Sequence, residues 1–219
     1  MAIPSKIHVM QIFVEGRNDV MAIGTLLKEY GYEWPQAEWH PYIKDCESVE
    51  KLLETLPVGF KSPTTTRLGV VLDADTDLCS RWQQIRNRLL ELDIDCPEHP
   101  DPSGTVIEVK NRKITKFGVW LMPNNTDPGM LEDFLYSLVA VEDSELLTFA
   151  SEKTTEAIKY KNASLKKTHH SKGTMHSFLA WQEDPGLPFG TAITAKILKM
   201  DAPIAEQFIE WIKRLFMDD

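Results

Sequence analysis

Nearly unbroken apolar runs alternate with segments of helical periodicity over the first 140 residues of the chain. The apolar runs predict buried strands, because a strand covered on both faces reads as a continuous hydrophobic segment. The predicted strands occupy residues 7–14, 38–43, 67–72 and 117–122. Apolar residues that recur every three or four positions predict amphipathic helices over residues 20–30, 48–56 and 78–92. This alternation predicts an α/β fold with a mainly parallel sheet flanked by helices.

Local signals add detail to this outline. Asn18 or Asp19 is expected to cap the first helix, because short polar side chains accept hydrogen bonds from the first helical turn. Residues 57–66 are predicted as a loop that begins with proline. Residues 106–109 and 116–121 are predicted to pair as a hairpin across a polar turn.

The chain beyond residue 140 is predicted to be mostly helical and ends in a strongly amphipathic segment, residues 203–216. We therefore predict two parts, an α/β domain over residues 1–140 and a helical C-terminal extension over residues 141–219 that packs on it. The last segment carries more apolar side chains than a single covering helix needs. This excess raises the hypothesis of a homodimer or another partner on that face.

The composition of the chain excludes several classes of protein. At 219 residues, with 42% hydrophobic and 26% charged residues, the chain has an ordinary globular composition. Its formal net charge of −9 argues against a protein that coats nucleic acid by charge alone. The three cysteines form no CxxC pair and the first apolar run is too short for a membrane span, so we expect a cytoplasmic protein. No Walker A sequence occurs, which excludes an ATP-driven motor.

Two of the predicted strands end abruptly in carboxylates. Glu15 follows the first apolar run, and Asp73 and Asp75 follow the run at residues 67–72. Ligands of open α/β sheets bind beyond the carboxyl ends of the strands, so we expect these side chains to converge there. Carboxylates in one small volume raise each other's pKa unless a cation neutralises them, and an all-oxygen cluster suits Mg²⁺ or Mn²⁺. The sequence therefore predicts a divalent-metal site formed by Glu15, Asp73 and Asp75.

A lysine-rich stretch follows the predicted α/β domain. Six lysines lie between Lys153 and Lys172, with Glu156 as the acidic residue within the stretch. One interpretation is a phosphate-facing edge beside the acidic site. A solvated helix face is the simpler explanation for most of these lysines.

A strand ending in Glu15-Gly16, followed by a strand ending in Asp73-Ala74-Asp75, resembles the Toprim fold of topoisomerases, bacterial primases, recombination proteins and overcoming-lysogenization-defect nucleases. More narrowly, the motifs at residues 123–125, 128–132 and 183–186 are similar to an uncharacterised prokaryotic Toprim-related family over nearly the whole chain. The resemblance implies a Toprim, Rossmann-like sheet in which Glu15, Asp73 and Asp75 bind Mg²⁺. It also implies acid/base work for Glu15.

The leading hypothesis is a nuclease or related phosphoryl-transfer enzyme that uses Mg²⁺ or Mn²⁺ and acts on DNA or RNA. Glu132 is the candidate for a second-ion ligand or a general base, although the helix dipole also explains a carboxylate in a first helical turn. Lys172 is the candidate for transition-state charge stabilisation, and Lys166 or Lys167 would serve nearly as well. Family analogy adds a separate ATPase partner in prokaryotic defence.

Two other functions stay open. A metal-binding interaction or effector module would use the carboxylates to hold a structural ion, and the acidic charge and short length favour it. A primase-like nucleotidyltransferase would need a nucleotide pocket that these residues do not indicate. Asp73, Asp75 and Asp77 also have a simpler interpretation, as turn and cap residues of the helix that begins near Leu78.

Overall fold

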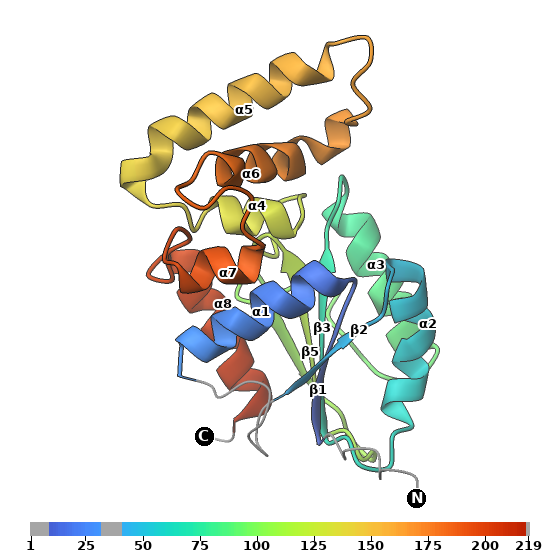
Figure 1. Ribbon diagram of the computed structural model, residues 1–219. Coiled ribbons are helices and arrows are strands. Elements are labelled where there is room, and N and C mark those ends of the chain that lie inside the picture. The colour runs from blue at the N-terminus through green and yellow to red at the C-terminus, as the bar shows by residue number, and fades with distance from the viewer. Residues whose placement is uncertain (1–8, 32–40, 218–219) are drawn as a thin grey trace, which may run out of the picture.

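The computed structural model describes residues 9–31 and 41–217, arranged as Figure 1 shows. Within these residues, five strands form one sheet in the order β2-β1-β3-β5-β4, and β4 runs antiparallel to β5 while the other pairs are parallel. The strands are β1 (Met10–Val14), β2 (Tyr42–Asp45), β3 (Arg67–Asp73), β4 (Thr105–Glu108) and β5 (Lys116–Met122). The predicted α/β fold with a mainly parallel sheet is confirmed, and so is the hairpin.

Helices cover both faces of the sheet. The first four helices are α1 (Arg17–Glu29), α2 (Val49–Phe60), α3 (Leu78–Leu90) and α4 (Leu131–Tyr136). The chain continues through α5 (Ser144–Ile158), α6 (His170–Ala180), α7 (Phe189–Thr194) and α8 (Pro203–Phe216), with short 3-10 turns at Val141–Asp143 and Lys167–His169. The predicted helical C-terminal part is therefore confirmed.

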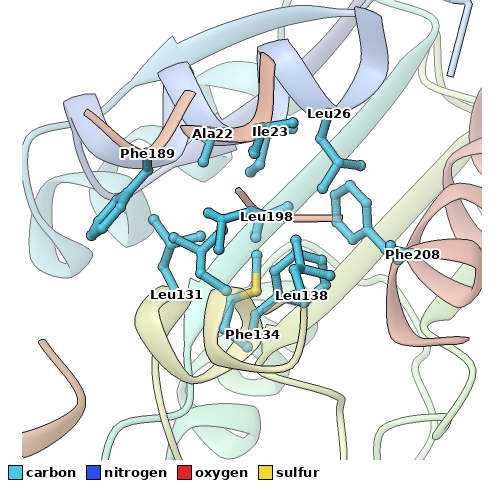
Figure 2. Packing of buried hydrophobic residues seen from close by; sticks show 14 of the residues in the cluster. Ala22, Ile23, Leu26, Leu131, Phe134, Leu138, Phe189, Leu198 and Phe208 are labelled. Atoms are coloured by element: carbon cyan, nitrogen blue, oxygen red, sulfur yellow. The ribbon is translucent and has the colours of Figure 1, made fainter. Parts of the chain in front are cut away.

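Two apolar clusters seal the two faces of the sheet, since alternate residues of a strand point to opposite faces. Ile12 and Val14 of β1 belong to the cluster shared with α1, α4 and α8, whereas Phe13 belongs to the cluster shared with α2 and α3. Figure 2 shows side chains of α1, α4 and α8 meeting in the first of these clusters. Buried residues of α5, α6 and α7 also belong to it, so the C-terminal helices share a core with the sheet.

Helix α8 uses its apolar side within the chain. The Trp211 side chain is fully buried, and its indole N–H donates to the Thr105 carbonyl at 3.1 Å. Beside it, the rings of Trp120 and Phe208 meet edge to face with centroids 5.1 Å apart. The apolar residues that raised the hypothesis of a dimer interface are therefore part of the core, and the homodimer loses that support.

Two predicted boundaries need correction. Helix α2 continues through Pro57 to Phe60, where the sequence predicted a loop. Proline in a helix interior costs roughly 3 kcal/mol, and burial of the Phe60 ring, worth roughly 1.5–3 kcal/mol, offsets most of that cost. The second strand, predicted over residues 38–43, is observed at Tyr42–Asp45, and residues 38–40 lie outside the described part. Residues 7 and 8 of the first predicted strand also lie outside it.

The sheet order makes β1 and β3 parallel neighbours. Phe13 is aligned with Val70, so the residues that follow the two strands emerge at one edge of the sheet. This edge also receives the N-terminal ends of the helices that follow the parallel strands. No helix in residues 9–31 or 41–217 has both the length and the apolar character needed to cross a membrane.

Candidate functional site

A cleft of about 520 Å³ opens at the edge of the sheet where β1 and β3 end. The N-terminal ends of α1, α2 and α4 form its walls, together with a lysine from α6. Arg17 and Lys172 are the cations among its lining residues. Its carboxylates are those of Glu15, Asp19, Glu47, Glu50, Asp73 and Glu132.

Glu15 and Asp73, the two predicted ligands that line this cleft, are linked through the backbone. The Asp73 N–H donates to Oε1 of Glu15 at 2.8 Å, and the Leu131 N–H donates to Oδ1 of Asp73 at 2.9 Å. The two carboxylates therefore join β1, β3 and the start of α4. Among the described residues, these hydrogen bonds use one oxygen of each carboxylate, which leaves Oε2 of Glu15 and Oδ2 of Asp73 for a ligand.

Burial makes these carboxylates difficult to ionise without a cation. It raises the pKa of Glu15 from 4.5 to about 7, against the lowering effect of the Asp73 N–H. Burial also raises the pKa of Asp73 well above its ordinary 3.8, and the nearby charges of Glu15, Asp19 and Glu132 add to this effect. The pKa of Asp19 rises to about 6 for the same first reason. The cleft therefore favours binding of a positive charge.

Glu132 and Lys172 reach the same cleft from α4 and α6. Glu132 is only 4% exposed, and Nζ of Lys172 lies 3.7 Å from its Oε1. The structure thus brings both predicted residues beside Glu15 and Asp73. Lys166 and Lys167, the alternatives to Lys172, are exposed and do not line the cleft.

Asp75, the third predicted metal ligand, lies outside the cleft. Its φ of 54° is left-handed, and its N–H donates to the Gly129 carbonyl at 2.8 Å, so the chain turns directly after β3. The Asp75 carboxylate forms an ion pair with Arg81, whose Nε also donates to the Asp73 carbonyl at 2.8 Å. The prediction assumed a strand that continues through Asp75. The turn instead places this residue in a neighbouring cavity of about 610 Å³.

The donor chemistry of the cleft fits a hard divalent cation. Among the residues that the structure describes, no group of three His, Cys, Asp or Glu side chains is placed to hold a metal ion. Mg²⁺, however, usually keeps several waters and binds through only one or two carboxylates plus substrate phosphates. Glu15 and Asp73 supply two carboxylates with available oxygens, which matches that mode of binding.

Helix ends add positive potential to the cleft. Helices α1, α2 and α4 begin there, with Gly16, Ser48 and Met130 as their N-caps. The N-terminus of a helix carries a partial positive charge that favours anions. The cleft therefore combines carboxylates for a cation with positive helix ends and Lys172 for an anion, as a metal-bound phosphate requires.

Comparison with protein families gives one assignment. A family model described as "Protein of unknown function (DUF3226)" matches residues 9–217. The chain belongs to this family. The DUF3226 match extends over the sheet and the C-terminal helices, so it includes the cleft and all the predicted site residues. No curated protein and no solved structure matches the chain.

Two residues in or beside the cleft of this DUF3226 chain were not predicted as site residues. Asp19 was interpreted only as a helix cap. The N-cap residue is Gly16, and Asp19 is a buried residue of the first turn whose Oδ2 accepts from the Gly16 N–H at 3.1 Å. An acidic residue in a first helical turn is too common to signal a site. Arg81 gave a usable signal, because a charged residue falls on the apolar stripe of α3, and the structure buries it beside Asp75.

We expect the metal-free protein to lose stability as the pH rises through the window from 4.5 to about 7. A carboxyl whose pKa is raised in the folded protein binds its proton more tightly there than in the unfolded chain. The protonated carboxyl therefore stabilises the folded protein at low pH, and this contribution disappears above the folded-state pKa. Relative to Glu15→Gln, the wild type should lose roughly 2 kcal/mol between pH 5 and pH 8. Urea unfolding at both pH values in chelator measures this difference. Parallel pH profiles of the wild type and the variant would contradict a raised pKa of Glu15.

Proposed function

We propose that this protein is a Toprim-related phosphoryl-transfer enzyme that uses Mg²⁺ or Mn²⁺ to hydrolyse phosphodiester bonds in nucleic acid. The observation that carries the proposal is the Glu15–Asp73 pair, formed where two adjacent parallel strands end and buried enough to raise both pKa values. The β1 and β3 context of this pair matches the positions that the Toprim resemblance assigns to metal ligands.

Each residue of the cleft has a role in this proposal. Glu15 and Asp73 would hold the cation, which supplies a Lewis acid for the phosphate and lowers the pKa of bound water. The Toprim resemblance also assigns acid/base work to Glu15. Glu132 would bind a second ion or act as a base, and Lys172 would stabilise negative charge on the phosphate.

The sequence indicates that any ATPase activity would come from a partner protein. It contains no Walker A motif, so any dependence on ATP would require a separate ATPase, as in Toprim nucleases of prokaryotic defence. Such a partner is part of the proposal by analogy with those nucleases. We further propose a cytoplasmic location, where nucleic acid and Mg²⁺ are both available.

A non-catalytic metal-binding module is the second candidate. It is favoured by the pairing of Asp75 with Arg81, which takes one predicted ligand away from the cleft. Under this candidate, a single ion would stabilise the junction of β1, β3 and α4 without any chemistry. Metal-dependent stabilisation without cleavage of any nucleic acid would favour it.

The direct test is a cleavage assay with labelled DNA and RNA, both single-stranded and duplex, in Mg²⁺, Mn²⁺ or chelator. We expect cleavage with either metal and none in chelator. Glu54→Gln and Asp95→Asn, which alter exposed carboxylates away from the cleft, serve as matched controls and should cleave normally. Cleavage that persists in chelator, or no cleavage of any substrate, would contradict the proposal.

A further inference from the structure

The chain is acidic overall, yet it carries no Asp or Glu from residue 157 to residue 182. Five lysines lie within this stretch, at positions 159, 161, 166, 167 and 172. We call residues 159–172 the lysine segment. Among the described residues, Lys172 is the member of this set that forms an ion pair, with Glu132. Positive charge confined to one segment of an acidic protein favours an anionic partner at that place.

The lysine segment connects α5 to α6 on the side of the molecule toward which the parallel strands end (Figure 1). Its C-terminal end reaches the candidate site, because Lys172 lines the cleft and the Ser171 hydroxyl donates to Asp133 of α4. Thr168 and His169 line the neighbouring cavity together with Asp75. The segment therefore leads from an exposed connection between helices to the carboxylates.

Packing holds the C-terminal half of the lysine segment in place. Leu165 covers Gly173 of α6 so closely that a Cβ on the glycine would lie 2.6 Å from the leucine Cδ2. His170 Nε2, which follows the 3-10 turn, lies 2.9 Å from Oγ1 of Thr155 on α5. All five lysines nevertheless remain exposed. An anchored backbone with exposed lysine side chains is suited to contacting several phosphates of one polymer.

Tyr160 lies at the start of the lysine segment between Lys159 and Lys161, and it is 72% exposed. Aromatic side chains within positively charged surfaces stack on the bases of single-stranded nucleic acid, whatever the sequence. A duplex keeps its bases stacked inside and does not offer them to an isolated ring. The exposed ring between two cations therefore favours an unpaired strand over a duplex.

We propose that the lysine segment binds single-stranded nucleic acid and leads it into the carboxylate cleft, with the lysines on phosphates and Tyr160 on a base. This inference rests on the proposed phosphodiester cleavage and specifies its substrate as a single strand. Lys172 is the last cation on the path, and a phosphate that it contacts lies in the same cleft as Glu15 and Asp73. The net charge of −9 works against strand binding over the surface as a whole, which favours binding at a local basic segment.

The test measures binding by fluorescence anisotropy, in chelator so that no strand is cleaved. The probes are labelled oligothymidylate, oligouridylate and a DNA duplex of equal length. Tyr160→Ala removes the ring, and Tyr160→Phe retains it. A Lys110→Gln/Lys113→Gln variant, altered in the β4–β5 connection at the opposite edge of the sheet, controls for the removal of positive charge elsewhere on the surface. The charge variant itself replaces Lys159, Lys161, Lys166 and Lys167 by Gln and leaves Lys172 intact.

We expect the wild type to bind both single strands roughly 10-fold or more tightly than the duplex. Binding by the four-lysine variant should depend less on salt. The magnitude of the slope of log K against log salt should fall by about 2–3, since each single-strand phosphate contact contributes about 0.7. Tyr160→Ala should weaken binding roughly 10-fold at an unchanged slope, whereas Tyr160→Phe and the control lysine pair should bind like the wild type.

Two results would overturn the inference. Equal affinity for the duplex and the single strands would contradict base stacking on the Tyr160 ring. Unchanged binding by the four-lysine variant would mean that these lysines serve another anionic partner, such as an acidic protein surface. Strand binding and phosphodiester cleavage are measured separately, so this inference and the proposed function can fail independently. Metal-dependent cleavage with unchanged strand binding would leave the nuclease standing without this segment. Strand binding through the lysine segment without cleavage would support the binding site and contradict the nuclease proposal.

Discussion

Glu15→Gln and Asp73→Asn are each expected to reduce metal-dependent phosphodiester cleavage by roughly 10²–10³-fold or more, as removal of one electrostatic contact to a transition state does elsewhere. Each substitution deletes a negative charge that would hold the cation. Each also keeps an oxygen that can accept the existing backbone hydrogen bond, from the Asp73 N–H or from the Leu131 N–H. The fold should therefore survive while the chemistry is lost.

The readout is the initial cleavage rate at saturating Mg²⁺ or Mn²⁺, with circular dichroism and thermal unfolding measured on the same samples. Above pH 7 and in chelator, both variants should be at least as stable as the wild type, because a buried carboxylate with a raised pKa has been replaced by a neutral amide. Cleavage rates within about 3-fold of the wild type in both variants would exclude the pair from the chemistry.

Lys172→Ala is expected to lower kcat for cleavage by roughly 100-fold with a smaller change in KM, because its ammonium would act on charge that develops in the transition state. Lys172→Arg should recover part of the loss, since it retains the positive charge. Lys153→Ala, which removes a lysine paired with Glu156 on α5, is the matched control.

The position of Lys172 beside Glu132 requires a second variant. Removal of the lysine leaves a carboxylate that is 4% exposed without its ion-pair partner, and this could impair the protein structurally. The Glu132→Gln/Lys172→Ala double variant removes that unpaired charge. A double variant that regains wild-type cleavage would show that Lys172 only neutralises Glu132, and would contradict its role in the chemistry.

The strand-end carboxylates were predictable because the signals around them are local. The apolar run before Glu15 and the run before Asp73 each form one buried strand, and both strands occupy the middle of the sheet. Parallel strands of one sheet end at the same edge, so strand identity predicts that Glu15 and Asp73 reach this edge. Their direct contact also requires β1 and β3 to be neighbours, which the sheet order supplies.

Asp75 shows where local reasoning stops. Its position two residues after Asp73 predicted a shared face, but the left-handed turn and the ion pair with Arg81 redirect it. The turn depends on the Gly129 carbonyl, which is distant along the chain, so the spacing of Asp73 and Asp75 does not reveal it. Arg81 is near in the sequence, but its pairing with Asp75 depends on the same turn.

The contribution of the C-terminal helices also depends on tertiary contacts. Lys172 reaches the cleft because α6 packs beside α4, whereas Lys166 and Lys167 do not line it. The sequence offered these lysines as near equivalents, and packing distinguishes them. Tertiary burial also accounts for two other features. Helix α2 continues past Pro57 to the buried Phe60, and the apolar side of α8 with Trp211 packs in the core.

The central claim is that the carboxylate cleft binds a divalent cation, and calorimetric titration tests it most directly. Mg²⁺ and Mn²⁺ are titrated into the wild type and into the Glu15→Gln/Asp73→Asn double variant at pH 7.5. We predict binding to the wild type, with proton release as the cation displaces protons from the raised-pKa carboxyls, and no binding to the folded double variant. Equal binding by both proteins, or none by either, would contradict the metal site.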